Sequence, residues 1–207
     1  MITTAYAAWS VSAFEQPSTS KWNILGTNDV FFNTQVGSNF SSGTSSTVWW
    51  EELGRTTLGA SNDTVSVASF AARKYLRFAF YGIASGQISL SIRFNNDSGA
   101  NYAIRQDANG AADATAGSQT SLIIYSAGTR QSLYLDSMVI TNIAAQEKIF
   151  HAFGIDGGTA GAANPPGRTT QVCKWANTSN QITRIDAINT GTGDFASGSE
   201  LVVLGHD

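Results

Sequence analysis

Side chains that catalyse reactions or bind metals are sparse in this sequence, and their spacing fits no common site. The two histidines, His151 and His206, lie on separate segments, and no His-x-x-x-His or paired-cysteine spacing for zinc is present. Cys173 is the only cysteine, and without a nearby histidine it is better explained as a small apolar core residue than as a nucleophile. The Gly-x-Ser-x-Gly elbow of serine hydrolases does not occur. We therefore expect no metal site, no bound cofactor and no catalysis.

Acidic residues offer two further possibilities, and neither is favoured. The segment 107–113 places oxygen ligands around a glycine, as calcium loops do, but it lacks their alternating acidic run and terminal glutamate. We interpret it as a solvated loop. A carboxylate pair for glycoside hydrolysis would have to form from residues distant in sequence. The sequence gives no positive sign of such a pair among Glu51, Glu52, Asp186 and Glu200.

Aromatic residues are the better candidates for a functional role. Trp49 and Trp50 are adjacent, so in an extended segment they face opposite sides of a sheet. Burial of both in the core is one interpretation. An exposed tryptophan can instead stack on a sugar or anchor a neighbouring subunit, because it carries a large apolar area at low entropy cost. We assign the same possible roles to the irregularly spaced aromatic residues near the N-terminus: Tyr6, Trp9, Phe14 and Trp22.

The elements that would position these residues have the pattern of β-strands. Apolar residues alternate with other residues in segments 76–80 and 88–94, and the glycine-bounded segment 82–86 between them predicts a hairpin. No segment has a convincing 3.6-residue period. About ten strands separated by turn formers predict an all-β antiparallel sandwich, and a jelly roll is the preferred topology. The remaining predicted strands are 65–67, 102–105, 122–125, 133–143, 148–155, 169–175, 182–188 and 201–204.

The chain divides into an N-terminal arm, residues 1–45, and a single sandwich domain, residues 46–207. The arm mixes aromatic residues with turn formers and has no sustained period. The Ala- and Gly-rich segment 107–118 is predicted to be a surface loop. We expect the arm to serve assembly, with its aromatic residues buried against another subunit or another protein of an assembly; folding back over its own sandwich is the alternative.

Composition narrows the partners and the compartment. Charged residues are only 13% of the 207, the net charge is −3, and no basic block is available to bind nucleic-acid phosphates. No stretch approaches the ~20 apolar residues of a membrane helix, and the first residues lack the basic start of a signal peptide. A lone cysteine excludes an intrachain disulfide. We expect assembly in a cytoplasm, with stability from packing or oligomerisation and with neither nucleic acid nor membrane as partner.

Two motifs carry a family resemblance. Residues 93–103, RFNNDSGANYA, resemble the RFN-x-D-x-G-x-NY signature of a group of tailed-phage proteins, which are themselves similar to virion decoration proteins or tail-fibre head domains. Residues 175–185, WANTSNQITRI, and 193–205, GDFASGSELVVLG, are similar to the C-terminal ending of the same group. Folding alone can explain both motifs. We expect a turn with Gly99 at positive φ, the Tyr102 ring directed inward, and Trp175 in the core.

The resemblance implies a non-enzymatic virion protein assembled in the host cytoplasm. The preferred role is a capsid decoration or cement protein, a homotrimer bound to the major capsid protein or to other virion proteins. The alternative is a tail-fibre or receptor-binding domain that binds a host-surface glycan. A sugar-cleaving enzyme is the third and weakest possibility.

Overall fold

The computed structural model describes residues 50–207, apart from 131 and 140. Over these residues the chain is all-β, as the sequence predicts, and Trp50–Asp207 forms one compact unit. Its strands are β1 (Glu51–Thr57), β2 (Thr64–Ala68), β3 (Tyr75–Ser85), β4 (Gln87–Phe94), β5 (Tyr102–Ala108), β6 (Ala114–Gln119), β7 (Leu122–Thr129), β8 (Ser132–Val139), β9 (Lys148–Asp156), β10 (Gly167–Trp175), β11 (Arg184–Ile188), β12 (Asp194–Phe195) and β13 (Glu200–His206).

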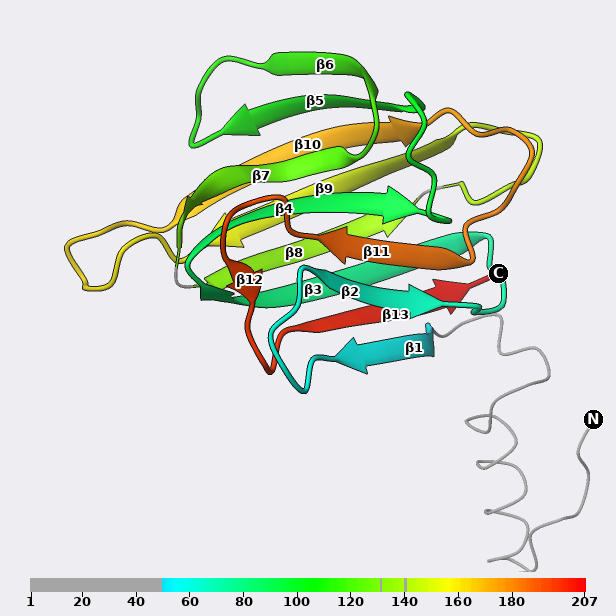
Figure 1. The fold of residues 1–207 in the computed structure, drawn as a ribbon. Helices are drawn as coiled ribbons and strands as arrows, with labels where there is room; N and C mark the ends of the chain where they lie inside the picture. The colour runs from blue at the N-terminus through cyan, green and yellow to red at the C-terminus, as the bar shows by residue number, and fades with distance from the viewer. Residues whose placement is uncertain (1–49, 131, 140) are drawn as a thin grey trace, which may run out of the picture. The chain divides into compact units, whose positions relative to one another are not determined.

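Eight of these strands form an antiparallel jelly roll. One layer has the order β1-β13-β3-β8 and the other β2-β11-β4-β7, and the chain crosses repeatedly between the two layers (Figure 1). Two sheets that exchange strands in this way are the double Greek key of a jelly roll. The fold class expected from the sequence is therefore confirmed.

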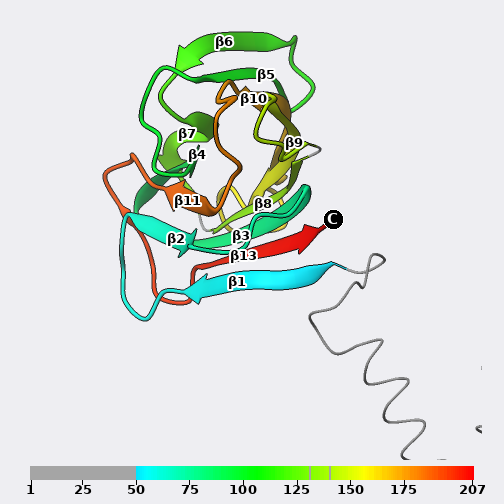
Figure 2. The ribbon, with the colours of Figure 1, turned by 90° about the vertical axis from the view of Figure 1, so that its right-hand side faces the viewer.

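Two additional hairpins widen the first layer. The β9–β10 pair continues the sheet beyond β8, and the β5–β6 pair continues it beyond β10, while β12 pairs with β3. The extended sheet curves over the edge strand β7 of the smaller sheet, as Figure 2 shows end-on. Gly154 in β9 permits this approach, because a Cβ there would lie 2.8 Å from the Tyr125 ring of β7. Gln171 Nε2 joins the layers by donating to the main-chain oxygen of Ile123 at 3.0 Å.

The core lies between the sheets and is dominated by aromatic rings. Phe94 of β4 is fully buried and meets Phe150 of β9 with ring centroids 5.2 Å apart at 78°. Phe78 and Trp175 lie 6.1 and 5.8 Å from the same ring. Edge-to-face and tilted pairs of this kind stabilise a core beyond their buried area. The inward alternation expected at Phe78 and Phe94 is confirmed.

The predicted hairpin between segments 76–80 and 88–94 is wrong. β3 runs on to Ser85 and pairs with β13 and β8, whereas β4 lies in the other sheet and pairs with β11 and β7. A single residue, Gly86 at φ +121°, turns the chain from one layer to the other. Both segments have one apolar face. Two sheets that pack face to face bury the apolar faces of both segments, so the same alternation fits a hairpin and fits two strands in opposite layers.

Other element boundaries also differ from the prediction. The strand expected over 133–143 ends at Val139, and the segment 107–118, predicted to be a loop, contributes the edge strand β6. β1 was not predicted as a strand. Among the described residues we find no helix with the length and apolar character of a membrane span.

Candidate interaction surface

The outer face of the large sheet carries most of the exposed large apolar side chains among the described residues. We define the apolar face as six residues on four adjacent strands, β3, β8, β9 and β10: Tyr81, Tyr134, Ile149, Phe153, Ile155 and Val172. Their exposed fractions run from 37% for Ile155 to 54% for Val172. A contiguous patch of this kind marks an interaction site more often than do apolar residues scattered singly.

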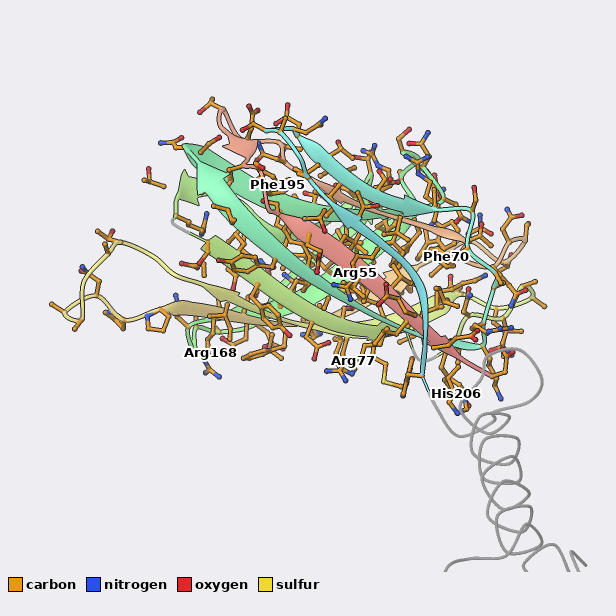
Figure 3. All side chains as sticks on the ribbon, turned by 90° about the horizontal axis from the view of Figure 1, so that it is seen from below. Arg55, Phe70, Arg77, Arg168, Phe195 and His206 are labelled. Carbon is orange, nitrogen blue, oxygen red and sulfur yellow. The ribbon has the colours of Figure 1, made fainter. Side chains whose placement is uncertain are left out.

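One row of this surface crosses the sheet at the end of β9. The register sets Tyr81 of β3 opposite Tyr134 of β8, and Tyr134 opposite Ile155 of β9. Ile155 in turn lies opposite Arg168 of β10. Two tyrosines, an isoleucine and a guanidinium therefore share one line of the sheet. Arg168 and Arg77 point away from the sandwich on the same side of the molecule (Figure 3).

The following rows are centred on β9. Phe153 lies opposite Asp136 of β8, and His151 lies between Met138 of β8 and Val172 of β10. His151 is exposed within this apolar setting. The middle of the face therefore holds no carboxylate except that of Asp136.

Two pairs of opposite charges lie on and beside the apolar face. The guanidinium of Arg77 donates to both carboxylate oxygens of Asp136, at 2.9 and 2.7 Å. The Lys174 amine pairs with the Glu147 carboxylate at 2.9 Å. These groups are largely exposed, so each pair contributes little to stability. Their effect is local neutrality, which lowers the energy needed to desolvate the surface in a contact.

A shallow hollow of about 320 Å³ lies at the β5–β10 side of the face. Its lining includes Ile149, Val172 and Lys174 from β9 and β10, and Arg105 and Thr115 from β5 and β6. The opposite side of the face, on β3 and β8, carries the bulkier Tyr81, Tyr134 and Met138.

Of the residues predicted as contact sites, only Trp50 is among the described residues. Tyr6, Trp9, Phe14, Trp22 and Trp49 lie outside the described residues. Trp50 is 38% exposed, and its ring lies 5.9 Å from that of His206, away from the six residues of the apolar face.

Among the candidate catalytic carboxylates, Glu52 and Glu200 meet at one arginine, whereas Asp186 lies on β11 of the other sheet. Glu52 and Glu200 both bind Arg55, at 2.9 and 2.6 Å, and Glu51 pairs with Arg73. Within the described residues, no three His, Cys, Asp or Glu side chains are placed to hold a metal ion.

The segment 107–113 forms a closed turn. Asp107 Oδ1 accepts the main-chain N–H of Gly110 at 2.9 Å, and Asp113 pairs with Arg105 at 3.2 Å. Both carboxylates are thus engaged by protein donors.

Three buried polar groups have structural roles. Lys148 Nζ donates to the main-chain oxygens of Gln146 and Asn177 at 2.9 and 2.8 Å, and burial lowers the pKa of its amine. Asp186 is bound by Arg184 and by the Ser66 hydroxyl. Burial raises the pKa of the Cys173 thiol to about 12, so the thiolate needed for nucleophilic chemistry is scarce at neutral pH.

The two sequence motifs meet at one end of the sandwich. Trp175 stacks on Tyr102 with ring centroids 6.4 Å apart, and its Nε1 donates to Asp97 Oδ2 at 2.7 Å. Asn95 Oδ1 accepts the main-chain N–H groups of residues 183–184 at 2.9 and 3.0 Å. The first motif therefore receives hydrogen bonds from the second, and packing explains why these residue types occur together.

The turn inside the first motif differs in one detail from the prediction. Positive φ angles fall on Asn95 and Asn96, at 49° and 56°, and not on Gly99. Asparagine tolerates this region better than most residues. A Cβ at Gly99 would lie 2.8 Å from Asn101 Nδ2, so a larger residue there would require the Asn101 side chain to shift. The predicted inward ring of Tyr102 is confirmed.

Comparison of the chain with protein-family models, curated proteins and solved structures gives no match.

Sequence reasoning missed the apolar face. Segment 148–155 is predicted to be a strand, and apolar residues occupy both of its faces. That double pattern was the available signal, because a strand with only one buried face alternates apolar with polar residues. Tyr81 and Tyr134 gave no such signal, since only the tertiary register brings them together.

Proposed function

We propose that this chain is a non-enzymatic structural protein of a tailed-phage virion, a decoration or cement subunit on the outside of the capsid. The observation that carries the proposal is the apolar face: a compact jelly roll with an outer sheet surface suited to burial has the design of an assembly subunit. The two motifs support the choice of assembly, because they resemble those of tailed-phage surface proteins.

In this role the protein forms a homotrimer that binds the major capsid protein or other virion proteins. The N-terminal arm ties subunits to one another or to the shell. Assembly takes place in the host cytoplasm, and the finished protein is part of the virion.

Co-sedimentation tests the cement role. Purified protein is mixed with capsid shells that lack it, and binding is measured at increasing protein concentration. We expect saturable binding with a fixed number of copies per shell and a rise in the shell's thermal midpoint. Linear, non-saturating uptake with no effect on shell stability would contradict the cement role.

A second candidate is a tail-fibre or receptor-binding domain for a host-surface glycan. Tyr81 and Tyr134, opposite each other on the outer face and in line with Arg168, support this alternative. Exposed aromatic rings stack on sugars, and a guanidinium binds carboxylates or phosphates. A glycan array separates the two: binding that Tyr134→Ala abolishes and Ile123→Ala leaves intact favours the receptor-binding role.

A further inference from the structure

We propose that three copies of this chain close around a three-fold axis through the apolar face, with β9 nearest the axis and the strands running along it. The inference deepens the proposed function, because it assigns a surface to the proposed homotrimer. The occupant of the apolar face is therefore the same face of two other copies.

The first argument is the pattern of β9. Its inward residues Phe150 and Ala152 are buried in the core, while its outward residues include Ile149, Phe153 and Ile155. Strands that are apolar on both sides are typical of sheets covered on both faces. In the described part of the chain only one side of β9 is covered, so the other side is available to the two other copies.

The apolar face supplies a large part of the area that a stable interface buries. If a large side chain offers about 200 Å², six such residues at these exposed fractions give about 500 Å². A stable interface buries about 800 Å² per partner. The apolar face supplies more than half of that area, and the flanking polar rows can supply the rest.

The width of the apolar face fits a closed ring of three copies. Four strands at ~4.8 Å spacing make a face about 19 Å wide, and a triangular prism with sides of that width has its axis about 5.5 Å from each sheet. Packed sheets lie ~10 Å apart, so side chains from one sheet reach about half that distance. Three faces of this width therefore leave an interior that their own side chains fill.

The two halves of the apolar face complement each other. In a ring, the β3–β8 side of one copy meets the β10–β5 side of the next. The bulky Met138 then meets Val172 and the hollow, and Tyr134 meets Arg168, a pairing that allows a cation–π contact. Arg77 and Asp136 enter the contact already neutralised by each other.

Light scattering of the full chain tests the trimer. The wild type should have three times the 21.9 kDa mass of one chain. Phe153→Asp should reduce the mass to that of one chain at micromolar concentration, because three carboxylates would meet at the axis. Ile123→Asp is the matched control, since Ile123 has the same 39% exposure as Phe153 but lies on β7 of the small sheet. It should remain trimeric.

Melting curves by circular dichroism show whether each variant is folded. A folded Phe153→Asp variant that stays trimeric would overturn the proposal, and so would a monomeric wild type. If Phe153→Asp fails to fold, Val172→Asp, at the most exposed position of the face, takes its place with the same expected result.

Cross-linking tests the arrangement within the ring. Met138→Cys and Val172→Cys are combined in one chain; the two positions lie on strands separated by β9, about 10 Å apart, which is too far for an intrachain disulfide. Oxidation should give covalent trimers that thiol reduction reverses, and neither single variant should give them. Covalent dimers alone, or no product, would overturn the three-fold arrangement.

The outcome is separable from the proposed function. A chain that binds shells but is not a trimer through this face would refute the present inference alone. A trimer that binds no shell would refute the cement role and leave the inference standing.

Discussion

Replacement of Phe94 by alanine should lower the free energy of unfolding by about 3 to 5 kcal/mol, the range for truncation of a buried phenylalanine. Phe94 has no exposed surface, and aromatic rings from β3, β5, β9 and β10 surround it. These rings all belong to the large sheet that faces β4, and they cannot collapse into the space without moving strands. We therefore expect a value near the upper end of the range.

Urea denaturation followed by tryptophan fluorescence measures this change. Ser91→Ala on the same strand is the control, with an expected effect below about 1 kcal/mol, because it removes only a hydroxyl from the opposite face of β4. Ser91 is itself buried, which the sequence did not indicate. Equal losses for the two variants, or a loss below about 1 kcal/mol for Phe94→Ala, would refute the assignment of the core.

Three further predictions concern other parts of the molecule. Desolvation raises the pKa of the Asp97 carboxyl, but hydrogen bonds from Trp175, Asn101 and Gly99 outweigh this effect and leave the pKa lowered. The Asp97 carboxylate therefore stabilises the fold at any pH above the carboxyl pKa of the unfolded chain. This stabilisation is lost as the pH falls through the carboxyl pKa of the folded chain. Asp97→Asn should therefore flatten the decline of unfolding free energy below about pH 4, and an unchanged acid profile would contradict this. Cys173 should resist alkylation at pH 8 in the folded protein and react fully in urea; rapid labelling of the native state would show that the thiol is accessible. A chain beginning at Ser46 should keep its thermal unfolding midpoint within a few degrees of the full chain's but lose particle binding. A large fall in the midpoint with particle binding intact would instead place the arm in the core of the domain.

The sequence predicts the fold class well and the connectivity less well. Alternation in the segments that became β3 and β4 depends on local residue types, so strand positions could be inferred. The partner of each strand depends on packing between layers. Gly86 illustrates the difference, since one residue decided between a hairpin and a crossover, and the sequence shows only that a turn occurs there.

The interaction surface was harder to predict than the core. Residues such as Phe150 and Phe153 have the same type, and only the direction of the side chain from β9 separates a core residue from a contact residue. Tyr81 and Tyr134 are distant in sequence and are brought together by the register of β3 and β8. The motifs could be recognised from sequence, but their mutual hydrogen bonds at Asp97 and Asn95 required the structure.

The most direct test of the proposed function is the position of the protein in an intact particle. Antibodies raised against residues 50–207 are applied to mature virions and detected by electron microscopy. We expect labelling over the outer surface of the head, and reconstruction of the particle should show three-lobed density at repeated positions of the shell. Labelling confined to the tail tip would contradict the cement role in favour of receptor binding, and absence of the protein from mature particles would contradict both.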